Sequence, residues 1–175
     1  MIIDIYYVIP EIFLSLSLMF LLLLGVFKKN GSSFVYNLSI IILIISVPLI
    51  LNVPSGDETL IFNDSYKVDY LSNFIKSLIV ISTLFVLLTS AQYLKSIKIY
   101  NVEYPILILS SILGMMVMVS SNDLIVFYVG LELQSLALYV LASFDRDNVL
   151  SSESGLKYFV LSALSSGLLL YGCSL

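Results

Sequence analysis

The chain has 175 residues, of which 59% are hydrophobic and only 11% are charged, and its mean hydropathy is +1.06. Because about a quarter of the residues in a soluble domain are charged, this composition excludes an ordinary soluble protein and indicates an integral membrane protein. The net charge of −4 comes without any basic cluster of the kind that binds nucleic acid.

The cysteine and histidine content limits the redox chemistry open to this chain. The sequence contains one cysteine, Cys173, and no histidine. An iron–sulfur cluster needs several thiolates, and haem usually needs histidine, methionine or cysteine ligands. We therefore expect no cofactor and no metal in this chain. If the chain takes part in redox chemistry, the electrons are carried by other subunits.

Six apolar segments are long enough to cross a hydrocarbon core of about 30 Å as helices. The runs are continuous and do not alternate apolar with polar residues, which favours helices over a β-barrel. The expected fold class is all-α: a polytopic membrane helix bundle forming one transmembrane domain over residues 1–175. In chain order the expected spans are Val8–Phe27, Phe34–Leu51, Tyr70–Leu94, Tyr104–Ser120, Leu124–Ser143 and Ser154–Leu175.

Lysine and arginine in the connecting loops predict the orientation of the bundle. With alternating spans, one side carries only Lys67, and the other side carries Lys28, Lys29, Lys95, Lys98 and Arg146. Because basic loops stay on the cytoplasmic or matrix side, the N-terminus is expected outside. No lysine or arginine precedes the first apolar run, which indicates a retained span and not a secretory signal peptide.

Glu132 lies eight residues into the fifth expected span, roughly 12 Å along the helix and close to the middle of the membrane. An ionised acid at that depth is costly, so it should be protonated, paired, or face a hydrated cavity. Tyr128, Ser135 and Tyr139 share its helix face, which makes a polar stripe able to hold hydroxyls and water. The alternative is a neutral Glu132 bonded to a neighbouring helix for packing alone.

Two lysines also lie in or near expected spans. Lys157 comes about one turn into the sixth span, where it could either act beside Glu132 or extend to the membrane surface. Lys76 is near the outer end of the third span and is expected to extend to the surface. Ser152 is placed to cap the sixth helix, with Glu153 in its first turn.

Small residues predict where helices approach one another closely. Gly114 and Gly130 are expected to allow this on the fourth and fifth spans. The sixth span carries two further pairs at small-xxx-small spacing, formed by Ser162, Ala163, Ser166 and Gly167.

The segments "ELQSLALYVLASF" and "SGLKYFVLSALSSGLLLYG" closely resemble the subunit 2 or subunit N family of NADH:quinone oxidoreductase, the antiporter-like membrane subunits of respiratory complex I. "IPEIFLSLSLMFLLLLG" is similar to the first helix of that family, and "VDYLSNFIKSLIVIS" to the third. The resemblance covers nearly the whole chain and is strongest from about Asn122 onward.

This resemblance implies proton translocation driven by electron transfer elsewhere in the complex. The family's intramembrane glutamate matches Glu132, and the lysine of its "GLKYF" motif matches Lys157, so these two residues are the expected catalytic pair for proton translocation. NADH, FMN, iron–sulfur clusters and ubiquinone would belong to other subunits. The implied location is the mitochondrial inner membrane or, alternatively, a bacterial inner membrane.

The family chain is much longer, and its later helices with further lysines have no counterpart here. We therefore expect an N-terminal part: a split gene product, a truncated copy or an incomplete sequence. The expected partners are other membrane-arm subunits of complex I, a second polypeptide that supplies the missing helices, and the lipid bilayer. Two alternative functions stay open: a subunit of a multisubunit sodium/proton antiporter, and a structural or assembly piece that does not pump.

Overall fold

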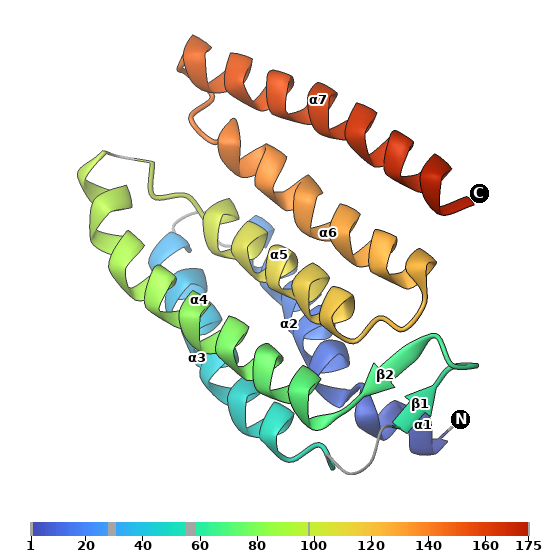
Figure 1. The fold of residues 1–175 in the computed structure, drawn as a ribbon. Helices are drawn as coiled ribbons and strands as arrows, with labels where there is room; N and C mark the ends of the chain where they lie inside the picture. The colour runs from blue at the N-terminus through green and yellow to red at the C-terminus, as the bar shows by residue number, and fades with distance from the viewer. Residues whose placement is uncertain (1, 28–30, 55–58, 98, 175) are drawn as a thin grey trace.

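The computed structural model describes residues 2–27, 31–54, 59–97 and 99–174. Seven helices and one β-hairpin lie within these ranges. Figure 1 shows the long helices side by side, with the hairpin and the short first helix at one end of the bundle. The elements are α1 (Ile2–Tyr7), α2 (Ile9–Phe27), α3 (Ser32–Leu51), β1 (Thr59–Ile61), β2 (Tyr66–Val68), α4 (Tyr70–Ser96), α5 (Glu103–Val119), α6 (Leu124–Ala142) and α7 (Val149–Ser174).

The expected membrane helices are all present. Among the described residues, α2, α3, α4, α6 and α7 are long and apolar enough to cross a membrane, and α5 is a shorter apolar helix of 17 residues. At 1.5 Å per residue, α5 spans roughly 26 Å, and it lies within the bundle beside the longer helices (Figure 1). The all-α polytopic fold predicted from the sequence is thus confirmed.

Polar side chains at the helix starts explain several boundaries. Asp69 accepts a hydrogen bond from the Ser72 amide at 2.7 Å, and the Ser72 hydroxyl accepts one from the Asp69 amide at 3.1 Å, which makes a capping box for α4. Asp123 accepts from the Ile125 amide at the start of α6. Each cap satisfies backbone donors that have no partner within the helix.

The sixth span begins earlier than the sequence suggested. Asn148 accepts a hydrogen bond from the Leu150 amide at 3.0 Å, and α7 begins at Val149 and not at Ser154. The expectation that Ser152 caps this helix is wrong, because Ser152 already lies inside it and its amide donates to the Asn148 carbonyl at 3.1 Å. Asn148 caps the helix instead, because its short side chain reaches the backbone amide two residues further along the chain.

The long acidic loop forms a β-hairpin that the sequence did not reveal. The strands β1 and β2 pair antiparallel, with Thr59 opposite Val68 and Ile61 opposite Tyr66. The turn between them holds Phe62, Asn63 and Asp64 at positive φ, where asparagine and aspartate are tolerated far better than phenylalanine. The inward face of the hairpin covers a small apolar cluster of Val53, Ile61, Tyr66 and Val68.

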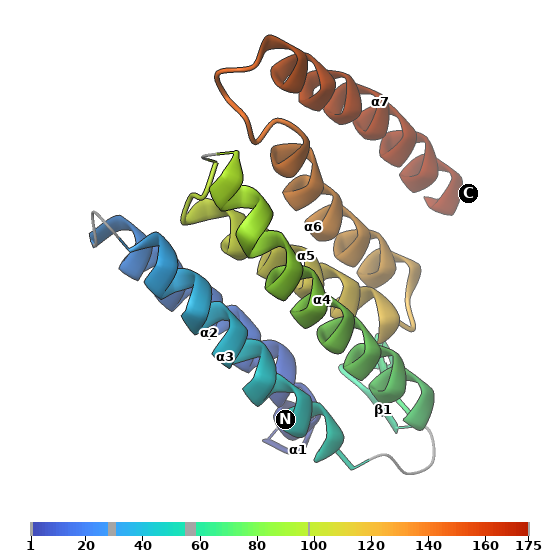
Figure 2. The ribbon, with the colours of Figure 1, turned by 90° about the vertical axis from the view of Figure 1, so that its left-hand side faces the viewer.

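The helices form a central group with two helices added to one side. The main hydrophobic core joins α2, α3, α4 and α5, and α5 contacts each of the other three. The next helix, α6, packs on α5, and α7 packs mainly on α6. Figure 2 shows α7 at the edge of this arrangement, and the window of α7 that could span a membrane has no buried residue.

The contact between α5 and α6 is a backbone contact made possible by two glycines. A Cβ atom added at Gly114 would lie 2.6 Å from the Gln134 amide nitrogen, and one added at Gly130 would lie 2.8 Å from the Met118 amide nitrogen. Real Cβ atoms do not approach backbone so closely, so both positions require glycine. This confirms the expectation for this pair of spans, whereas at Gly167 in α7 an added Cβ would meet nothing within 4 Å.

The Gly130→Ala substitution should force α5 and α6 apart and destabilise the bundle by about 1–3 kcal/mol, the usual cost of overpacking a close contact. Thermal unfolding of the purified protein in detergent measures this effect. Gly167→Ala is the matched control, because the same methyl group enters open space. Equal melting temperatures for the two variants would contradict the backbone contact.

Candidate functional site

Glu132 lies in the middle of α6. It is half-buried, and its Oε1 atom is buried without a hydrogen-bond partner among the described residues. Gly130 and Gln134, two residues to either side, face α5, so Glu132 lies roughly 200° around α6 from that contact, on the face that carries Tyr139. A buried carboxylate oxygen without a partner is unfavourable, so this atom is ready to bind a proton or a water molecule.

The polar stripe that runs along α6 from Glu132 reaches α7 at one end. Tyr139 donates a hydrogen bond to the hydroxyl of Ser162 in α7, and its ring packs edge-to-face on Tyr158 and Phe159. Ser135 donates to its own helix backbone at Leu131. Of the hydroxyl groups in this stripe, that of Tyr139 connects α6 with α7, whereas that of Ser135 bonds to the α6 backbone.

The structure does not bring Lys157 to Glu132. The Lys157 side chain is 70% exposed and pairs with Glu153 at 2.6 Å on the same helix. Gly155 of α7 packs against Ser143 of α6, which places Lys157 close to the level of Leu141. That level is roughly 14 Å along the helix axis from Glu132.

The side of α7 that carries Lys157 also faces away from α6. Residues in a helix are about 100° apart, so Lys157 is roughly 200° around α7 from the buried Gly155. An effect of Lys157 on Glu132 would thus have to act through other groups on the exposed side of α7. The catalytic role assigned to the two residues stays a prediction.

Lys76 does not extend to the membrane surface, and that expectation is wrong. Its side chain is 2% exposed, and its Nζ atom lies 2.6 Å from Oε1 of Glu11 in α2, which is itself 6% exposed. A partner inside the protein is available, so the lysine forms a buried ion pair and does not need water at the surface.

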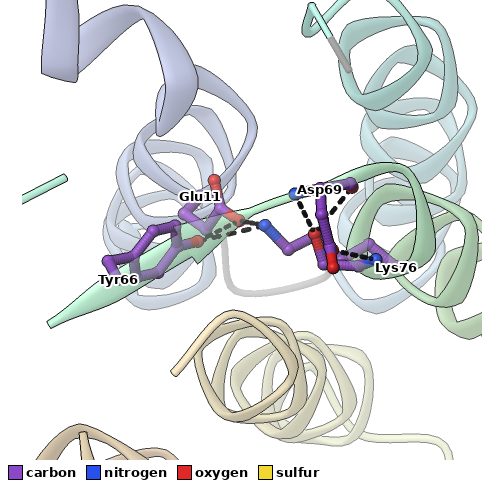
Figure 3. A network of polar contacts seen from close by, with 5 residues as sticks. Glu11, Tyr66, Asp69 and Lys76 are labelled. Carbon is purple, nitrogen blue, oxygen red and sulfur yellow. Dashed lines mark hydrogen bonds and ion pairs between the residues drawn. The ribbon is translucent and has the colours of Figure 1, made fainter. Parts of the chain in front are cut away.

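Tyr66 completes this cluster, which we call the buried triad: Glu11, Tyr66 and Lys76. The Tyr66 hydroxyl donates to Glu11 Oε1 at 2.7 Å and accepts from Lys76 Nζ at 3.1 Å. Figure 3 shows the three side chains converging from α2, β2 and α4. Burial and the negative charge of Glu11 raise the pKa of Tyr66 above its ordinary value, so the phenol stays neutral at physiological pH.

The sequence held part of the signal for this cluster. Asn73 and Lys76 are three residues apart and therefore lie on one face of a helix, and both are buried. Alternating spans also put Glu11 and Lys76 at the same end of the bundle. The partners of Lys76 could not be assigned from the sequence, because Tyr66 lies in a β-hairpin and hydropathy does not predict how its strands pair.

The hairpin also joins the buried triad to the start of α6. The Lys67 amide donates to the Ser120 carbonyl at 2.8 Å, and the Asn122 amide donates to the Ser65 carbonyl at 3.0 Å. The Asn122 side chain donates to the Asp64 carbonyl at 2.7 Å. One β-like layer thus extends from the hairpin to the residue just before the cap of α6.

The ion pair of the buried triad should show strong coupling between its partners. Lys76→Met should destabilise the protein by about 3–5 kcal/mol, because it leaves Glu11 buried without a counter-charge. The double variant Glu11→Gln with Lys76→Met should recover most of that loss. Thermal unfolding of the purified protein in detergent gives the coupling through a double-mutant cycle.

The exposed pair between Arg146 and Glu103, 2.8 Å apart with side chains 75% and 53% exposed, is the matched control. Removing its charges should change stability little, because water screens both partners. Additive losses in the Glu11 and Lys76 variants would show that the two side chains do not pair in the folded protein.

The family model and the relatives that match this chain all point to membrane subunits of NADH-quinone oxidoreductase. Residues 121–175, which contain α6 and α7, match the family model described as "NADH:quinone oxidoreductase/Mrp antiporter, TM". The chain is 67% identical over 169 residues to NADH-quinone oxidoreductase subunit N of Pelagibacter ubique, covering 97% of this chain and 36% of that protein. It is 48% identical to subunit N of Maricaulis maris, covering 98% and 36% respectively.

Among solved structures, the chain is similar to one in the membrane-bound sulfane sulfur reductase, an archaeal respiratory membrane complex. The TM-score is 0.76 at 17% identity, and the match covers 97% of this chain and 36% of the other. At this identity the likeness shows the fold alone. The present chain spans about a third of the length of the curated relatives it matches.

The high identity extends over almost every residue of this chain and includes both helices of the family match. The chain is therefore a homologue of the N-terminal part of NADH-quinone oxidoreductase subunit N, with the fold of the antiporter-like membrane subunits.

Proposed function

We propose that this chain serves in the membrane arm of a proton-pumping NADH:quinone oxidoreductase, where it contributes to proton translocation coupled to electron transfer from NADH to quinone. The observation that carries the proposal is Glu132, a carboxyl group midway along α6 with a buried oxygen that has no partner among the described residues. It lies inside the segment that matches the antiporter-like family. Acidic side chains inside membrane helices commonly mark proton routes.

In this proposal Glu132 gains and loses a proton as the charge around it changes. A nearby cation favours the ionised form of a carboxyl group, and removal of that cation favours the protonated form. The free Oε1 atom is where the proton or a water molecule would bind. The hydroxyls of Tyr139 and Ser162, which are hydrogen-bonded to each other, would extend the polar route toward α7.

Lys157 would take part through helices that cover the exposed side of α7. Its side chain faces away from α6, and large apolar residues on that helix are more than half exposed, including Leu161 at 68% and Leu164 at 66%. We propose that a second polypeptide of the complex packs there and places buried charges between Lys157 and Glu132. Other membrane-arm subunits are partners of the same assembly.

The proposed location is a bacterial inner membrane, because the relatives that the chain matches are bacterial. The relatives give no support to a mitochondrial location. For the orientation, Lys67 lies at the hairpin end of the bundle, while Lys95 and Arg146 lie at the opposite end. The basic end would face the cytoplasm. Lys28, Lys29 and Lys98, which also supported this orientation, are outside the described residues.

A sodium/proton antiporter subunit is the second candidate, because the matching family model covers Mrp antiporters as well. The chemistry of Glu132 would be the same in both. Co-purification with NADH dehydrogenase activity separates the two functions. A purely structural role in the membrane arm is separated from both by the substitution described next.

Glu132→Gln should lower coupled proton pumping by about tenfold or more while the complex still assembles, because the amide cannot take up a proton. Glu132→Asp should be milder, since it keeps the acid. Proton uptake by proteoliposomes during NADH oxidation measures the effect. Glu103→Gln, which removes an exposed carboxylate, is the control and should pump normally. Full pumping by an assembled Glu132→Gln complex would support the structural role instead.

Cross-linking tests the covering of α7. A cysteine placed at Leu164 should cross-link to a second membrane polypeptide in the native complex, and mass spectrometry should find that chain in equal amount. A cysteine at Ser111 in α5, which is 5% exposed in the core, should give no such product. A cross-link only to a continuation of the same polypeptide would refute the second chain, and lipid contact alone would refute any helix partner.

A further inference from the structure

The buried triad is an ionisable site that the proposed role of Glu132 does not use. Glu11 is 5% exposed, Tyr66 6% and Lys76 2%. The cost of removing two charges from water can exceed their attraction, so a buried ion pair is weak evidence for a gain in stability. Apolar residues would fill the same volume without that cost. A gain in packing stability therefore does not explain why Glu11 and Lys76 are buried here, and a role in proton binding has to be considered.

The Glu11 carboxylate has one occupied and one free oxygen. Its Oε1 atom accepts hydrogen bonds from both Lys76 and Tyr66. Its Oε2 atom is buried and has no partner among the described residues. Because an ionised carboxylate can accept hydrogen bonds at both oxygens, the geometry leaves one acceptor for a proton or for water.

Two further buried polar atoms meet no hydrogen-bond partner in the described part of the chain: the amide nitrogen of Asn73 and the hydroxyl of Ser120. The Ser120 side chain interacts with Tyr66 of the triad. Ser120 is joined through its carbonyl to the Lys67 amide, next to Tyr66. Asn73 precedes Lys76 by three residues on the same face of α4. Bound water satisfies buried groups of this kind, usually with two to four polar partners for each molecule.

We propose that the buried triad is a second proton-exchange site of this membrane domain, in which Glu11 binds a proton at Oε2 through bound water and Lys76 supplies the balancing charge. The site lies under the hairpin, at the end of the bundle where α2 and α4 begin (Figure 1). Its ligands are a proton and water. The use of this site in proton transport rests on the proposed function of the chain, whereas proton binding at Glu11 does not.

A proton binds Oε2 of the ionised Glu11, an O–H bond forms, and the charge of the triad rises from zero to plus one. Lys76 has then lost its counter-charge, and its ammonium group releases a proton to water while the bonding electron pair stays on Nζ. Transfer of the carboxyl proton to the neutral amine restores the starting pair. One proton has entered at Glu11 and one has left from Lys76.

The other titratable groups around the site are compatible with this exchange. From β2, Tyr66 stays neutral because burial and the charge of Glu11 raise its pKa. Lys67 points to the opposite face of the hairpin and pairs with Asp69 at 3.4 Å, with both side chains partly exposed. Tyr7 of α1 packs against the apolar cluster under the hairpin. Among the described residues of these elements, only Glu11 and Lys76 are buried groups that ordinarily carry charge.

Labelling with dicyclohexylcarbodiimide tests the site without turnover. This apolar reagent adds to a protonated carboxyl group, and rearrangement leaves a stable N-acylurea that mass spectrometry detects on the peptide. In native membranes Glu11 should be labelled, and the labelled fraction should rise severalfold as the pH is lowered. In Lys76→Met, labelling at neutral pH should rise severalfold, because loss of the cation favours the protonated acid.

Arg146→Gln is the matched control, because it removes the cation from the exposed pair with Glu103 and should leave Glu11 labelling unchanged. If Glu11 stays unlabelled at every pH in the series, the proposal is wrong. The pH series on the native chain decides this even if Lys76→Met fails to fold. Since no proton pumping is needed, the result is independent of whether Glu132 has its proposed role.

A transport measurement then tests whether the exchange is used. The double variant Glu11→Gln with Lys76→Met carries no buried charge at the site and should assemble. We expect it to oxidise NADH while moving fewer protons per electron than the native complex in proteoliposomes, with Arg146→Gln equal to native. An assembled double variant with the native proton-to-electron ratio would show that the buried triad is a structural ion pair.

Discussion

A charge inside a hydrocarbon core must be neutralised, paired or hydrated, and this constraint governs how the bundle is built. Glu11 meets the constraint through Lys76 and Tyr66. Glu132 has a buried oxygen with no partner among the described residues. The two acids therefore differ in their surroundings: Glu11 has its counter-charge in place, whereas Glu132 Oε1 has no hydrogen-bond partner in the described part of the chain.

The hairpin covers the buried triad and connects it to the start of α6. Its inner face provides Tyr66 to the buried triad, and its backbone bonds reach the residues just before α6. The helix that carries Glu132 is then held against α5 through Gly114 and Gly130. A continuous set of hydrogen bonds and close backbone contacts thus links the surroundings of the two acids, although they lie on different sides of α5.

The most exposed long helix of the bundle, α7, lies within the segment that matches the family model. Within the described residues of α7 only Gly155 is buried, yet α6 and α7 together make up the family match. Lys157 points to the uncovered side and pairs only locally with Glu153. This explains why Lys157 and Glu132 do not form an isolated pair, and why the proposed function needs further helices.

The sequence predicted the helices well because each membrane helix satisfies its own backbone and can be recognised from hydropathy alone. It also predicted the close approach at Gly114 and Gly130, where the need for a small residue is local. It failed for the hairpin and for Lys76, because Tyr66 and Glu11 lie 55 residues apart in the chain and hydropathy carries no information on such pairing. Even the start of α7 depended on one Asn148 side chain.

In the proposed function, Glu132 changes its protonation while the complex works. Infrared difference spectroscopy of the assembled complex, recorded before and after NADH is added, reports this change directly, because a protonated carboxyl group has a C=O stretching band that a carboxylate lacks. We expect a carboxyl band that changes on turnover in the native complex and is absent from Glu132→Gln. A difference spectrum with the same carboxyl band in both would contradict the proposed function.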